Sequence, residues 1–219
     1  MATSPNNFIF FLEAVIFASV IFMHLSKKSS MVVSSYVVQS LALVMLLVSF
    51  ALKEASWMLL LAIAVIFLVK VLVAPRFFFG LVKKHQLKFS VSTYLNSPAT
   101  LIVLALLTGV TYSQLFAPLT ILSQNEGKTL LLAVATMFIS IFLIINRRGA
   151  LSQMIGILSL ENGIVSFATL AGLEQTPGLQ IGIMFDILVW IIIASVFASM
   201  LYRQFGSLDV ASMSHLKEE

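Results

Sequence analysis

Four ionisable side chains lie within long apolar stretches of the sequence: Glu13, Lys70, Glu161 and Asp186. A charged side chain at the centre of a lipid bilayer costs at least about 2.5–3.5 kcal/mol on insertion scales. Ionisable residues inside membrane segments therefore usually face a protein interior or a hydrated cavity, and they mark ion and proton pathways. We interpret these four residues as candidates for a proton path.

The composition is that of an integral membrane protein throughout. The chain has 219 residues, of which 60% are hydrophobic and 10% are charged, whereas soluble domains carry about 25% charged residues. The sequence contains no cysteine, which excludes disulfides and thiolate ligation of iron–sulfur clusters by this chain. His24, His85 and His215 are scattered in predicted flanks, so no metal site and no catalytic centre is predicted.

Seven stretches are long enough to cross a bilayer, since a spanning helix needs about 20 apolar residues. The predicted fold is therefore all-α, a polytopic bundle with spans at about 8–25, 31–52, 55–75, 95–117, 128–146, 150–173 and 179–202. Pro75 is expected to close the third span and Pro118 to end the fourth. The basic, aromatic stretch 76–94 is read either as an amphipathic segment on the membrane surface or as an ordinary loop.

The distribution of basic residues predicts the orientation of these spans. Cytoplasmic flanks carry an excess of Lys and Arg. With seven spans, only Lys53 and Lys128 fall on the outer side, and Lys70 falls inside the membrane. The other ten basic residues fall on the opposite side: Lys27, Lys28, Arg76, Lys83, Lys84, Lys88, Arg147, Arg148, Arg203 and Lys217. We therefore expect the N-terminus outside and the C-terminus in the cytoplasm.

The four ionisable residues are then expected at different depths, at 1.5 Å per helical residue. Lys70 would lie about 8 Å from the cytoplasmic end of its span, and Glu161 about 16 Å in, near the midplane. Asp186 and Glu13 would lie about 10 Å and about 7 Å from the outer ends of theirs. Such a ladder suits stepwise proton transfer. The alternative for Glu161 and Asp186 is a static interhelical hydrogen bond, and the alternative for Lys70 is snorkelling to the inner headgroups. For Glu13, a position at the membrane interface is favoured over a relay role.

Small and neutral polar residues are expected to support this path. Gly156 and Gly163 lie on a small-residue face that permits close helix packing, and the Asn162 amide can hydrogen-bond between helices. The two glycines would also suit a π-bulge, although a straight helix beside a tight neighbour is favoured. Gln39 in the second span is a further neutral polar group for a partner or water.

Several motifs together resemble a known family, component E of hydrogenase-4 and related formate hydrogenlyase complexes. They are SYVVQSLALV (35–44), FLVKVLVAP (67–75), IGILSLENG (155–163), QIGIMFDILV (180–189) and FGSLDV (205–210). The last three spans also resemble the K-type subunit of complex I and the C subunit of Mrp-type antiporters. Gly156 and Asn162 match the ends of their G-L-E-x-x-x-N pattern, but Leu158 stands where the acid would be, and the acid lies one turn on, at Glu161. The resemblance divides the chain into a four-helix part (1–127), a K-like three-helix part (128–204) and a cytoplasmic tail (205–219).

The resemblance implies a subunit without a catalytic centre in the inner membrane of a prokaryote. Its expected function is to contribute intramembrane acids to the proton path of a complex I-like, redox-driven ion-translocating complex of the group 4 hydrogenase type. Its expected partners are lipid, antiporter-like membrane subunits and a cytoplasmic redox arm, and nucleic acid is not among them. The partners would hold the iron–sulfur clusters and any NiFe centre. A structural spacer is the main alternative, and a self-contained transporter is disfavoured because the chain shows no inverted repeat.

Overall fold

The computed structural model describes residues 5–54, 57–84, 93–123 and 126–172, and within these ranges the chain is helical. An isolated antiparallel bridge pairs Thr93 with Arg147. The helical elements are α1 (Pro5–Leu25), α2 (Ser29–Glu54), α3 (Trp57–Phe67), η1 (Leu68–Val73), α4 (Ala74–Lys84), α5 (Ser97–Thr111), η2 (Ala117–Leu122), α6 (Gly127–Asn146) and α7 (Ala150–Leu170). Of these, η1 is a short π-helix and η2 is a short 3-10 helix.

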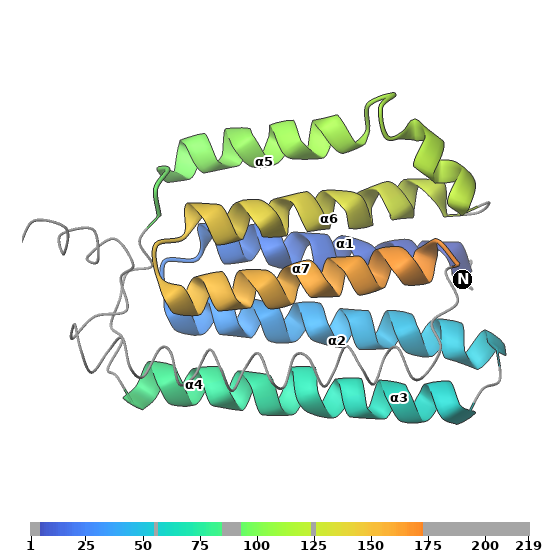
Figure 1. Ribbon diagram of the computed structural model, residues 1–219, viewed down its shortest axis with the longest axis horizontal. Helices are drawn as coiled ribbons and strands as arrows, with labels where there is room; N and C mark the ends of the chain where they lie inside the picture. Colours follow the sequence, from blue (N-terminus) through green and yellow to red (C-terminus); the bar gives the residue numbers. More distant parts are fainter. Residues whose placement is uncertain (1–4, 55–56, 85–92, 124–125, 173–219) are drawn as a thin grey trace, which may run out of the picture.

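The helices lie side by side and alternate in direction (Figure 1). The centre is formed by α1, α2, α6 and α7, with the most extensive packing between α6 and α7 and between α1 and α2. The continuous rod of α3, η1 and α4 flanks α2 on one side, and α5 flanks α6 on the other (Figure 1). The two parts expected from the sequence, before and after residue 127, thus pack against each other.

Within the described residues, five helical segments are long and apolar enough to cross a membrane, as in a multi-pass membrane protein. They are Asn7–Leu25, Ser29–Leu52, Leu59–Lys83, Gly127–Asn146 and Ala150–Leu170. The predicted fourth span is shorter than expected, because α5 ends at Thr111. The hydroxyls of Thr111 and Ser113 donate to the carbonyls of Thr108 and Val110 at 2.7 and 2.6 Å, and such local bonds compete with helix propagation. The predicted seventh span, 179–202, lies outside the described residues.

The prediction that Pro75 closes the third span is wrong. Proline lacks an N–H and its ring clashes with the carbonyl four residues earlier. Here the chain widens into the π turn η1 just before Pro75, and the N–H of Ala74 donates to the carbonyl of Val69, five residues back. The helix therefore continues to Lys84, and Arg76 lies on an amphipathic helix, α4, instead of opening a loop. Phe78 on α4 is buried whereas Arg76 is exposed.

Two apolar clusters fill the interior, with a polar layer between them. One cluster contains Met23, Val32, Tyr36, Phe78, Leu143 and Ile155, and the other contains Leu12, Ile16, Leu43, Leu47, Leu130 and Val165. Along α2 the two clusters are separated by Gln39 and Ser40, and along α7 by Ser159 and Asn162, all of them fully buried. The first cluster lies toward the end of the bundle that bears Lys27, Lys28, Lys83, Lys84, Arg147 and Arg148, which we call the basic end.

Candidate functional site

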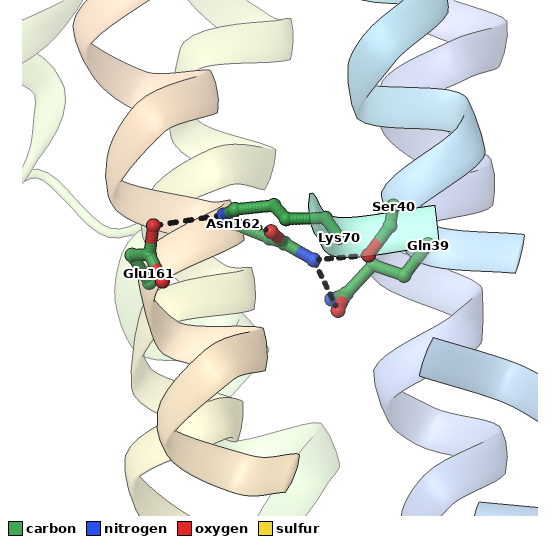
Figure 2. Close-up of polar contacts among 5 residues, drawn as sticks. All are labelled: Gln39, Ser40, Lys70, Glu161 and Asn162. Atoms are coloured by element: carbon green, nitrogen blue, oxygen red, sulfur yellow. Dashed lines mark hydrogen bonds and ion pairs between the residues drawn. The ribbon is translucent and has the colours of Figure 1, made fainter. Parts of the chain in front are cut away.

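The centre of the polar layer is the ammonium group of Lys70. Its side chain comes from the π turn η1 and is 2% exposed. Nζ lies 2.9 Å from Oε1 of Glu161 and donates to Oδ1 of Asn162 at 2.7 Å (Figure 2). Both partners project from α7. A buried cation is thus held by one carboxylate and one neutral carbonyl oxygen.

The amide of Asn162 is fixed from its other end. Its Nδ2 donates to Oε1 of Gln39 at 3.1 Å and to Oγ of Ser40 at 3.2 Å, both on α2 (Figure 2). Because both donors of the amide are used, its oxygen is presented to Lys70. The network therefore joins η1, α7 and α2 at one height in the bundle.

A pair of serines extends the network to α6. Nε2 of Gln39 donates to Oγ of Ser159 at 2.9 Å, and that hydroxyl lies 2.9 Å from Oγ of Ser140. Hydroxyl groups both donate and accept, so they can pass a proton along, whereas the amides of Gln39 and Asn162 orient their neighbours.

Glu161 lies at the edge of the bundle. Its side chain is 19% exposed, compared with 2% for Lys70. An ion pair in a low-dielectric interior stabilises the protein only when geometry and further hydrogen bonds offset desolvation. Lys70 receives that support from Asn162, and Glu161 connects the buried cation to the surface of this chain.

Lys70 lies deeper than the sequence predicted. Because the helix continues past Pro75, the spanning segment is Leu59–Lys83, and Lys70 is near its middle. Lys70 and Glu161 thus share one height instead of occupying separate inner and middle depths. The alternative in which Lys70 snorkels to the headgroups is wrong, because its ammonium is buried in the contacts described above.

Glu13 is buried between helices, and its expected position near the membrane interface stays a prediction. Its side chain is 0% exposed, and Oε2 accepts a hydrogen bond from the hydroxyl of Ser166 on α7. Ser159, Asn162 and Ser166 follow one face of α7, at spacings of three and four residues. Glu13 therefore lies about 6 Å farther from the basic end than the Lys70–Glu161 pair, measured along α7 from Asn162 to Ser166.

The two glycines of α7 face α6. A Cβ on Gly156 would lie 2.8 Å from Cγ1 of Ile144, and one on Gly163 would lie 3.3 Å from the backbone N of Met137. This close approach brings Ser159 within reach of Ser140. The π turn lies at Lys70, whereas α7 is regular. Asp186, the fourth candidate of the proton path, lies outside the described residues.

Arg147 is a buried charge that sequence reasoning missed. The positive-inside count treats it as an ordinary loop cation, but its side chain is 1% exposed. Its guanidinium donates to the carbonyls of Met23, His24 and Ser26, the last two at 2.9 and 3.1 Å. Burial lowers the pKa of Arg147 to about 10, so the group stays charged at neutral pH. It satisfies the carbonyls left unpaired where α1 ends, and the only signal in the sequence is its place between two spans.

The fold and the site define a multi-pass helical membrane protein with a buried ion pair between its spans. In the ranges that the structure describes, no group of three or more His, Cys, Asp or Glu side chains is arranged to hold a metal. The chain matches no protein-family model, no curated protein and no solved structure.

Proposed function

We propose that this chain is a non-catalytic membrane subunit that carries protons for a complex I-like, redox-driven ion-translocating assembly. The observation that carries the proposal is the Lys70–Glu161 ion pair, buried at mid-span and held by neutral amides and hydroxyls. A lysine and a carboxylate that share a proton in a low-dielectric layer respond strongly to any nearby change of charge. Such a pair can take up a proton on one side and release it on the other.

The remaining candidates extend the path in the same direction. Glu13 would receive protons on the side away from the basic end, through the face of α7 that bears Asn162 and Ser166. Asp186 would serve in a seventh span. We propose seven spans with the N-terminus outside and the C-terminus in the cytoplasm of a prokaryotic inner membrane. The cations gathered at the basic end support this orientation.

The motif resemblance supports the kind of assembly, a group 4 hydrogenase or formate hydrogenlyase. This chain has no cysteine, so the iron–sulfur clusters and any NiFe centre would be held by cytoplasmic partners. Antiporter-like membrane subunits would lie beside Glu161, whose side chain reaches the edge of the bundle.

A structural spacer is the second candidate. It is favoured by the close contact between α6 and α7 at Gly156 and Gly163, which would make the bundle a stiff link between larger subunits. In that reading the polar layer fixes the register of the helices, a known use of buried polar groups.

The first test is purification of the tagged chain from its native membrane in mild detergent. We expect larger membrane subunits and iron-containing redox subunits to co-purify. Recovery of the chain alone, with ion transport in liposomes, would contradict the proposal and indicate a self-contained transporter.

The second test measures redox-driven proton uptake in inside-out vesicles carrying Glu161→Gln. We expect proton translocation to be lost, with the complex assembled on native gels. The matched control is Glu126→Gln, because Glu126 is an acid just before α6 whose carboxylate accepts a hydrogen bond from the nearby hydroxyl of Thr129. Unchanged translocation in Glu161→Gln would leave only the spacer.

A further inference from the structure

Arg148 follows the buried Arg147 in the chain but is held in a different way. Its guanidinium carbon lies 4.6 Å from the centre of the Tyr94 ring, a cation–π contact that orients the guanidinium plane. Its Nε is buried and has no hydrogen-bond partner among the residues that the structure describes. Arg147, in contrast, donates to the carbonyls at the end of α1. Arg148 is therefore a positioned cation with a donor that the described part of the fold does not use.

The ring beside Arg148 is fixed by the end of α6. The N–H of Tyr94 donates to the carbonyl of Asn146 at 3.0 Å, and the N–H of Leu95 donates to Oδ1 of the same residue at 3.0 Å. The ring itself is 56% exposed and lies at the basic end, where α6 ends and α5 begins (Figure 1). Because tyrosine is enriched where membrane helices leave the hydrocarbon for water, we expect the Arg148–Tyr94 stack at the level of the lipid headgroups.

The surroundings of this stack are basic. Lys27 and Lys28 are exposed, and they follow Ser26, whose carbonyl binds Arg147, the neighbour of Arg148. The acids that the structure describes lie inside the bundle or at its opposite end: Glu13, Glu54, Glu126 and Glu161. Within the described ranges, no acid therefore neutralises the cations at the basic end, and the charge there is complementary to an anion.

An exposed apolar surface begins directly beside the stack. Ile145 and Ile141 lie one turn apart on α6 and are 65% and 40% exposed. Ile145 directly precedes Asn146, the residue that holds Tyr94. A ligand that covers this surface and also reaches Arg148 needs an anionic group next to an apolar chain. Phospholipids have this chemistry, and basic sites at the cytoplasmic ends of membrane helices bind anionic headgroups.

We propose that Arg148, Tyr94 and the neighbouring Lys27 and Lys28 bind the headgroup of an anionic phospholipid, with an acyl chain along the exposed isoleucines of α6. The guanidinium binds the phosphate through charge-assisted hydrogen bonds. The lysines favour a headgroup with a net negative charge over a zwitterionic one. This lipid site goes beyond the proposed function, since none of its residues belongs to the polar layer.

The first experiment is native mass spectrometry of the full-length chain from micelles that contain equal amounts of phosphatidylglycerol and phosphatidylcholine. We expect phosphatidylglycerol to be retained preferentially. Arg148→Gln should weaken its binding at least about fivefold, the factor that corresponds to the roughly 1 kcal/mol contributed by one basic residue at an anionic membrane surface. Arg148→Lys should keep part of the preference, because it retains the charge but lacks the planar fork of arginine.

The matched control is Lys128→Gln, which removes an exposed cation at the opposite end of the bundle. It should leave the lipid preference unchanged. Equal retention of the two lipids by the unaltered chain would overturn the proposal, and so would equal losses in Arg148→Gln and Lys128→Gln. Release of the bound lipid by inorganic phosphate alone would indicate a bare anion site and would overturn the assignment to a lipid.

A second measurement locates the acyl chain by tryptophan fluorescence in lipid nanodiscs. Ile145→Trp should be quenched more strongly by brominated phosphatidylglycerol than by brominated phosphatidylcholine, and adding Arg148→Gln should abolish the difference. Leu61→Trp, at an exposed position on α3, should show no such preference. Both variants are compared with the parent chain, which contains Trp57 and Trp190. A preference that persists without the Arg148 guanidinium would overturn the proposed site.

Discussion

Among the residues that the structure describes, two cations, Lys70 and Arg147, are buried, and they are held by different kinds of partner. Lys70, at mid-height, contacts a carboxylate and an amide oxygen. Arg147, at the basic end, contacts three backbone carbonyls. A carbonyl cannot take a proton and arginine does not release one near neutral pH, so the charge at Arg147 is permanent. At the centre the partner of the cation is a carboxylate, which, unlike a backbone carbonyl, can accept a proton. The comparison separates a group that holds helices together from a group that can do chemistry.

The largest effect is expected at Arg147. Arg147→Gln should lower the free energy of unfolding by roughly 3–5 kcal/mol, because the carbonyls at the end of α1 lose charge-assisted hydrogen bonds worth about 1.5–3 kcal/mol each. Unfolding of the purified chain in mixed micelles measures this loss. The matched control is Lys27→Gln, an exposed cation in the adjacent loop, which should change stability by less than about 0.5 kcal/mol. Equal effects would show that Arg147 does not hold the end of α1.

At the central pair, a second substitution should restore the stability that the first one removes. Glu161→Leu should destabilise the chain by about 3 kcal/mol, because it leaves the Lys70 cation buried without its carboxylate. Adding Lys70→Met should restore most of that loss, since replacing both members of a buried pair by apolar residues is often neutral. The same unfolding assay measures both variants. A double variant less stable than either single one would mean that the pair itself stabilises the fold.

A smaller effect is expected where α7 connects the two regions. Gly156→Ala should cost about 1–3 kcal/mol, because its Cβ would lie 2.8 Å from Cγ1 of Ile144 and crowding a packed core has that cost. Gly109→Ala is the control, since an added Cβ there has no atom within 4 Å. That control should be neutral or slightly stabilising by helix propensity. If the two alanines behave alike, α6 and α7 are not held at close approach.

The smallest change in stability is expected for Lys70→Arg, which would turn the central cation into one that cannot release its proton. We expect a change in stability of about 1 kcal/mol, because the guanidinium keeps the charge and can still bind Glu161. Proton translocation should nevertheless fall by at least about 100-fold, in the range for loss of a positioned proton-transfer group. Vesicle assays on Lys70→Arg and on Lys128→Arg, an exposed control, decide the point. Retained translocation would assign Lys70 a purely electrostatic role.

The sequence predicted the helical class and most of the long apolar segments, because these depend on length and composition alone. It also identified Glu161, Asn162 and Gln39 as polar groups inside spans. It could not predict that Lys70 meets Glu161, since the contact joins residues 91 positions apart and depends on a π turn that carries the helix past Pro75.

The burial of Arg147 was equally hidden. A basic residue between two spans is normally counted by the side of the membrane on which it lies. Its role depends on where α1 ends in space, which sequence spacing does not give. The same holds for His24, whose position at the end of the first predicted span gave no sign that its ring is buried.

The short helix α5 has a consequence for the lipid beside it. Its 15 residues span only about 22 Å at 1.5 Å per residue, whereas the hydrocarbon layer is about 30 Å thick. It starts near the basic end, where Tyr94 bonds Asn146, so it stops short of the opposite leaflet. Hydrophobic mismatch of this kind thins the bilayer locally. The bilayer beside α5 is therefore expected to be thinner than the bilayer beside the longer helices of the bundle.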